Sequence, residues 1–112
     1  MSEQVSSLPE KTCEIDRLVT HERLIDSVLS GNKTQQRRNG VYGYPGETFK
    51  LNDTVFVITA LERQALGAMT DADARAEGFP DLETYKQIII SMHHGMSWNE
   101  THSVWVHTFA RQ

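Results

Sequence analysis

The 112-residue sequence has a single cysteine, three prolines and no long apolar run. Because Cys13 is alone, it cannot form an intrachain disulfide, and its free thiol is compatible with a reducing compartment. Without a long apolar run, no membrane span is expected. The first residues include Glu3, Glu10 and Glu14 and no apolar signal-peptide region. Together these absences predict a cytoplasmic protein.

Positive charge is also scarce. The chain has 11 Lys and Arg against 15 Asp and Glu, which gives a net charge of -4. This balance argues against a protein that coats nucleic acid through bulk positive charge. A polyanion would therefore have to bind to a local cluster of cations. The densest group of cations lies in residues 30–40 and consists of Lys33, Arg37 and Arg38.

The length suits one domain with one modest core. Residues 1–12, rich in Ser, Glu and Gln, are expected to form a flexible N-terminus. Residues 13–112 are expected to form a single domain, with no repeat and no low-complexity segment.

Three helices are predicted from capping residues and apolar spacing. The first covers residues 21–30, with Thr20 as its cap and a left-handed end at Gly31. A short second helix lies within residues 70–78, where Thr70 and Asp73 resemble a capping box. The third covers residues 82–93 after the cap Asp81. Its apolar stripe, expected to face the core, contains Leu82, Tyr85, Ile88, Ile89 and Met92.

Strands are predicted at both ends of the chain. Residues 13–19 alternate enough for a first strand, and residues 54–58 favour a buried strand that continues after Arg63 into a further one. The Gly- and Pro-rich segment 39–53 indicates a loop with a turn at its end, and residues 93–102 indicate another loop. Residues 103–110 alternate as a closing strand. This order predicts an α+β fold, a small partly closed β-barrel with two or three flanking helices.

The cationic segment places Gly31, Lys33, Gln36 and Arg38 at fixed spacing after the first helix. A turn followed by a strand would bring the last three side chains to one side. Glycine permits close approach of a ligand, lysine supplies a point charge and arginine a fork for phosphate or carboxylate. The amide of Gln36 can read a base edge. The alternative is an exposed polar strand edge without a ligand.

The stretch "LIDSVLSGNKTQQRR" resembles the signature of the ASCH domain family, GxKxxExR after an amphipathic helix. Gly31, Lys33 and Arg38 match this signature, whereas Gln36 stands where the family usually has Glu. The resemblance spans residues 13–112 and implies a small PUA-like mixed β-barrel. It also implies a cleft, lined by the motif, that takes RNA, modified nucleosides or nucleotide-like ligands.

One branch of that family, similar in length, cleaves N4-acetylcytidine with a Lys, a Thr and a later Glu. Carried across, the resemblance assigns the catalytic roles to Lys33 and Glu77. The threonine position holds Gln36, which has no nucleophilic oxygen, and Thr34 would need a different geometry. If Glu77 approaches Lys33, the carboxylate could polarise a water and the amine, its pKa lowered by Arg38, could act as a base.

Other chemistry-bearing residues give weaker patterns. Five histidines, including His93 and His94, form no HxH or HxxxH pair, so neither a metal nor a cofactor is expected. His107 is expected to be half-buried on the last strand. Trp98 can either pack its loop or stack on a base. Ser97 and Ser103 show no triad partners.

The sequence therefore predicts first a domain that binds RNA or a modified nucleoside in a basic cleft. Three alternatives stay open: an amidohydrolase of N4-acylated cytidine or a related nucleoside, a ribonuclease, and a protein-interaction module. No membrane partner is expected. The proposed ligand-binding residues are Gly31, Gln36, Arg38, Tyr42, Tyr44 and Trp98, beside the catalytic candidates Lys33 and Glu77.

Overall fold

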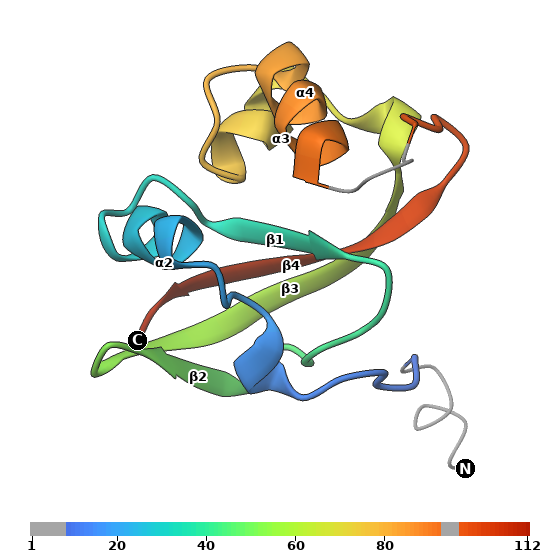
Figure 1. Cartoon of the computed structure of the whole chain (residues 1–112). Helices are drawn as coiled ribbons and strands as arrows, with labels where there is room; N and C mark the ends of the chain where they lie inside the picture. Colours follow the sequence, from blue (N-terminus) through green and yellow to red (C-terminus); the bar gives the residue numbers. More distant parts are fainter. Residues whose placement is uncertain (1–8, 93–96) are drawn as a thin grey trace, which may run out of the picture.

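The structure, a computed structural model, describes residues 9–92 and 97–112. Two single-turn 3-10 helices, three α-helices and four strands are found in these ranges (Figure 1). In chain order they are η1 (Ile15–Arg17), α2 (Glu22–Leu29), β1 (Gln35–Arg38), β2 (Thr48–Leu51), β3 (Thr54–Ala65), η2 (Leu66–Ala68), α3 (Asp71–Ala76), α4 (Leu82–Met92) and β4 (Ser103–Arg111).

The strands form one antiparallel sheet in the order β1-β4-β3-β2. The long strand β3 pairs with β2 near its start and with β4 along most of its length, with a register shift between Ile58 and Ala60. An irregularity of this kind bends a strand and increases its twist, and the sheet is curled into a half-barrel (Figure 1). A single parallel bridge joins Lys11 to Val41. The predicted α+β fold with a partly closed barrel and flanking helices is confirmed.

The described residues form two apolar clusters. The larger is made by α2, η1 and the sheet, and three phenylalanines (Phe49, Phe56 and Phe109) pack edge-to-face or stacked at its centre. The smaller lies under α3 and α4, around Leu66 and Tyr85. Figure 1 shows α3 and α4 together beyond β1, with α2 beside the same strand. Side chains of α2, α4 and β1 line one common cavity.

Three strand predictions were wrong. Residues 13–19 form no strand: Ile15–Arg17 is the 3-10 turn η1, and Leu18 and Val19 reach the core without strand pairing. The segment 39–53 contains β2, whose Phe49 and Leu51 point into the core. The following residues, Asn52 and Asp53, have positive φ, which suits a tight hairpin turn. Beyond Arg63, β3 continues as one strand rather than as a second one.

The three predicted helices are present, with changes at their ends. The cap of α2 is His21 rather than Thr20, because the His21 ring accepts a hydrogen bond from the Arg23 amide. The capping box of α3 is formed as predicted. Met92 does not belong to the buried stripe of α4, since it is 50 % exposed. In the described part of the chain, no helix has the length and apolar character needed to cross a membrane.

Two glycines with positive φ end the helices next to β1. Gly31 (φ 89°) follows α2 and Gly78 (φ 97°) follows α3. A methyl group added at Gly31 meets no atom within 4 Å, whereas one at Gly78 would lie 2.6 Å from the Ser27 hydroxyl. Both positions therefore carry backbone strain when substituted, and Gly78 carries a steric clash as well.

Alanine at these two glycines should separate the two effects. Gly31→Ala is expected to lower the free energy of unfolding by about 1–2 kcal/mol through its left-handed backbone alone. Gly78→Ala should cost about 1 kcal/mol or more beyond that, because Ser27 must move. Chemical denaturation of both variants measures the difference. Equal losses would show that Ser27 adapts without cost.

Candidate functional site

The centre of the site is the Glu77 side chain, which ends α3 in a buried position. The capping box starts this short helix, and Glu77 is its C-cap before the left-handed Gly78. The backbone of the connection into β1 is tied to the same helix end, since the Thr34 amide donates to the Ala76 carbonyl at 2.7 Å. Only 1 % of Glu77 is exposed. The end of α3 therefore delivers a carboxylate beside the start of β1.

Lys33 meets this carboxylate from the α2–β1 connection. Its Nζ donates to Glu77 Oε1 at 2.9 Å and to the Glu77 carbonyl at 3.1 Å. The side chain is as buried as its partner, with 1 % exposed. An ammonium group has three N–H donors, so one remains without a partner among the described residues.

Arg37 holds the second oxygen of the same carboxylate. Its Nη1 donates to Glu77 Oε2 at 2.8 Å, and Gln35, Gln64 and Asp73 surround the rest of the guanidinium. Because four acceptors hold it in place, Arg37 orients Glu77 and is poorly placed to reach a ligand. No role was predicted for Arg37 from the sequence. The sequence did indicate that Arg37 and Arg38 have different surroundings, because adjacent side chains on a strand point to opposite faces.

Burial dominates the electrostatics of this triad, which we define as Lys33, Arg37 and Glu77. Burial lowers the pKa of the Lys33 ammonium, an effect that the Glu77 carboxylate opposes and the nearby arginines reinforce. Two cationic side chains share one carboxylate. The triad therefore carries excess positive charge, and its lysine loses a proton more readily than a solvated lysine does.

Gln36 lies beside the triad with an unused hydrogen-bond acceptor. Only 8 % of the residue is exposed, and its Nε2 donates to the Arg37 carbonyl at 3.3 Å. Its Oε1 is buried and has no partner among the described residues. Burying a polar atom without a hydrogen bond costs about 1–3 kcal/mol, so this oxygen is a position where a ligand donor would stabilise the protein.

His107 on β4 holds the backbone of Gln36 in place. Its Nε2 accepts from the Tyr42 amide at 3.0 Å, so Nδ1 carries the proton and donates to the Gln36 carbonyl at 3.2 Å. The prediction of a half-buried His107 was wrong, because the residue is 0 % exposed. Its burial lowers the pKa of the imidazole, which favours the neutral ring.

Arg38 completes the set from the end of β1. Its Nε and Nη2 donate to the Leu18 carbonyl at 3.1 and 2.7 Å, and its guanidinium lies 5.2 Å from the centre of the Tyr42 ring. These contacts leave Nη1 without a hydrogen-bond partner in the described part of the chain. Arg38 is therefore a positioned cation with a free donor.

Two neighbouring cavities lie along β1. The smaller, which we call the inner cavity, has a volume of about 270 Å³ and the larger, the outer cavity, about 530 Å³. Lys33, Gln36, Arg38 and Glu77 all line the inner cavity, together with apolar side chains of α2 and α4. The structure thus brings together four residues that the sequence analysis selected from segments 44 positions apart.

The other selected residues lie elsewhere. Gly31 is exposed at the end of α2, and Trp98 lines the outer cavity. Neither Tyr42 nor Tyr44 is among the residues lining the two cavities. Tyr42 packs against Arg38, whereas the Tyr44 hydroxyl donates to the Pro9 carbonyl at 2.8 Å.

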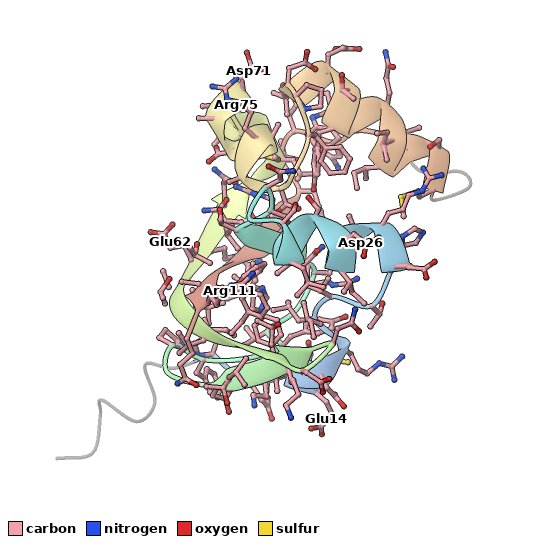
Figure 2. All side chains as sticks on the ribbon, turned by 90° about the vertical axis from the view of Figure 1, so that its left-hand side faces the viewer. Glu14, Asp26, Glu62, Asp71, Arg75 and Arg111 are labelled. Atoms are coloured by element: carbon pink, nitrogen blue, oxygen red, sulfur yellow. The ribbon has the colours of Figure 1, made fainter. Side chains whose placement is uncertain are left out.

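Most other charges lie at the surface. Figure 2 shows Asp71 and Arg75 on α3 and Glu62 on β3 at the periphery of the molecule, and all three residues are exposed. In the described ranges, no three His, Cys, Asp or Glu side chains gather closely enough to hold a metal ion. His93 and His94 lie outside these ranges. The buried triad is therefore a departure from the usual placement of charge.

Neither a protein-family model nor a curated protein matches the chain. The structure is similar to an ASCH domain from Lactobacillus crispatus JV V101, with a TM-score of 0.63 and 16 % identity over 99 % of this chain and 86 % of that one. It is also similar to a DUF984 protein from Enterococcus faecalis V583, with a TM-score of 0.57 and 15 % identity over 80 % and 67 % of the two chains. The chain therefore shares the fold of this ASCH domain, as the resemblance in residues 31–38 implied.

The triad predicts unequal effects of its two simplest substitutions. Glu77→Gln leaves two buried cations without their carboxylate and should lower the free energy of unfolding by about 3–5 kcal/mol. Lys33→Met leaves Glu77 paired with Arg37, so its cost should be clearly smaller. Urea denaturation of both variants tests this order, with Glu62→Gln as a surface control expected to change stability by less than about 0.5 kcal/mol. A reversed order would mean that Arg37 cannot hold Glu77 alone.

Proposed function

We propose that this protein binds a nucleobase, carried by RNA or by a modified nucleoside, in the inner cavity. The observation that carries the proposal is the Gln36 Oε1 atom, a buried acceptor without a partner in the wall that also presents Lys33. A natural protein rarely leaves such an atom unpaired, and a ligand is one of the usual reasons.

The hydrogen-bonding groups of this wall complement the edge of a base. Gln36 offers an acceptor for an exocyclic amino group, and the third N–H of Lys33 offers a donor for a ring nitrogen or carbonyl. Cytosine and adenine both carry an amino group next to an acceptor. The pattern therefore favours these bases over uracil, whose equivalent edge lacks an amino group.

The remaining walls suit a flat, largely apolar ring. Leu24, Phe79, Tyr85 and Ile89 line the same cavity. Burial raises the pKa of the Tyr85 phenol, so this side chain stays neutral at any ordinary pH. An apolar chamber with a few directed polar groups is the usual design of a small-molecule site. It also favours a ligand that enters the protein over a flat protein partner.

Replacing the unpaired acceptor should separate binding from stability. In Gln36→Met, which keeps the size of the side chain, the affinity for a cytidine derivative should fall about tenfold with the loss of one buried hydrogen bond. The free energy of unfolding should change by less than about 1 kcal/mol, because removal of the unpaired oxygen offsets the loss of the Nε2 hydrogen bond to the Arg37 carbonyl. Calorimetric titration with cytidine, N4-acetylcytidine and a short single-stranded RNA measures the affinity.

The matched control is Gln87→Met, an exposed glutamine on α4 that contacts Glu83. It should bind like the wild-type protein. The proposal fails if the wild-type protein binds none of the three ligands, or if Gln36→Met binds them with unchanged affinity.

A second candidate is hydrolysis of an N4-acylated cytidine, because burial lowers the pKa of Lys33 even though its contact with Glu77 opposes that shift. Neutral Lys33 would take a proton from a water molecule while the water oxygen bonds to the acyl carbon. The C–N bond would then break as the proton moves to the leaving amine, which releases cytidine and a carboxylic acid. With Gln36 in place of threonine, water would have to be the nucleophile.

Incubation with N4-acetylcytidine tests this candidate. If the reaction occurs, chromatography should show cytidine released by the wild-type protein and none by Lys33→Met. Thr34→Val should keep the activity, since the exposed Thr34 does not line the inner cavity. If the wild-type protein releases no cytidine, the hydrolase candidate is wrong and the binding proposal is unaffected.

A further inference from the structure

Two buried side-chain atoms in the described residues have no hydrogen-bond partner, Gln36 Oε1 and Trp98 Nε1. Gln36 lines the inner cavity and Trp98 the outer one. The Gln36 atom is an acceptor and the Trp98 atom is a donor, so the two atoms need different kinds of ligand group. Each cavity is therefore lined by one residue that carries an unpaired buried atom.

The two cavities are neighbours rather than separate sites. Their walls share four residues, Arg37, Arg38, Tyr85 and Ile89. Of the two arginines, Arg37 is held by acceptors of the protein, whereas Arg38 has a free Nη1 donor. The guanidinium of Arg38 therefore lies where the two cavities meet.

The outer cavity combines an apolar floor with a polar rim. Leu66 and Val104 belong to its floor, and Asn39, Asn99 and His102 contribute polar groups. The His102 ring and the Asn39 amide contact each other at 2.8 Å, so these rim groups are already oriented. At about 530 Å³ it is nearly twice the size of the inner cavity, and it falls within the usual range of ligand pockets.

The contacts of Trp98 point to a donor rather than a stacking surface. Lys86 lies 5.2 Å from the centre of its ring, and the Tyr85 ring meets it edge-on at 6.1 Å. Both contacts use the ring itself and leave the Nε1–H group unpaired. Trp98 therefore offers a directed N–H to a carbonyl or ring nitrogen.

We propose that the outer cavity holds the neighbouring nucleotide of a single RNA strand, so that the ligand spans both cavities. Trp98 Nε1 donates to an acceptor on the second base, and Arg38 lies at the phosphodiester that joins the two nucleosides. This inference rests on the proposed function, and it selects an oligonucleotide over a free nucleoside as the ligand. A local cation at the linking phosphate also suits a protein whose net charge is negative.

The experiment compares cytidine with the dinucleotides CpA and ApC by calorimetric titration. The wild-type protein should bind at least one dinucleotide about tenfold more tightly than cytidine, and this advantage should shrink as salt rises. Trp98→Phe keeps an aromatic ring but removes the donor. It should weaken dinucleotide binding about fivefold and leave cytidine binding unchanged.

Two further variants keep the test decisive. Trp105→Phe, on β4 beneath Arg63 and outside the lining of both cavities, should leave both affinities unchanged. His102→Ala removes an exposed rim residue without disturbing the core, and it should weaken dinucleotide binding even if Trp98→Phe folds poorly. If cytidine binds but no dinucleotide binds more tightly, or if neither Trp98→Phe nor His102→Ala affects dinucleotide binding, the two-cavity inference is wrong while the proposed function stands. If neither cytidine nor a dinucleotide binds, both proposals fail.

Discussion

The arrangement along β1 depends on one buried carboxylate. Glu77 accepts from Lys33 with one oxygen and from Arg37 with the other, at 2.9 and 2.8 Å. Ionised groups this far from water are tolerated only when their charges are paired and hydrogen-bonded. Because the three residues come from the α2–β1 connection, from β1 and from the end of α3, their pairing joins the helices to the edge of the sheet. The three paired residues are also part of the wall of the inner cavity.

The same join explains why the Gln36 acceptor is free. The neighbouring Arg37 is held by four acceptors. The Gln36 carbonyl accepts a hydrogen bond from His107, and the Gln36 Nε2 donates to the Arg37 carbonyl. The Oε1 atom is therefore fixed in direction and left unpaired. A rigid, unpaired acceptor binds a ligand donor without the ordering cost that a mobile side chain would add. The structural triad and the proposed binding group are thus two consequences of one set of contacts.

Local signals predicted the three helices and the glycines that end two of them, because caps and glycines act over a few residues. Gly78 is an example, since its positive φ follows from its place after α3. Strand β2 was missed because a Gly- and Pro-rich segment surrounds it, and residues 13–19 were assigned wrongly because burial there does not come from strand pairing. The contact of Glu77 with β1 joins residues 40 or more positions apart, and no local rule predicts it. The resemblance selected Glu77, but only the tertiary structure shows why Arg37 is needed.

The absence of a charge on Gln36 has a further consequence for the proposed ligand. Lys33, Arg37 and Arg38 place three cations around the inner cavity against the single carboxylate of Glu77. A glutamate in place of Gln36 would cancel part of this excess and would give Lys33 a second anionic partner, which would favour its protonated form. The neutral amide keeps the acceptor and leaves the excess positive charge for the proposed ligand. An acidic protein can in this way attract a phosphate-bearing ligand at one place while its surface as a whole repels bulk polyanions.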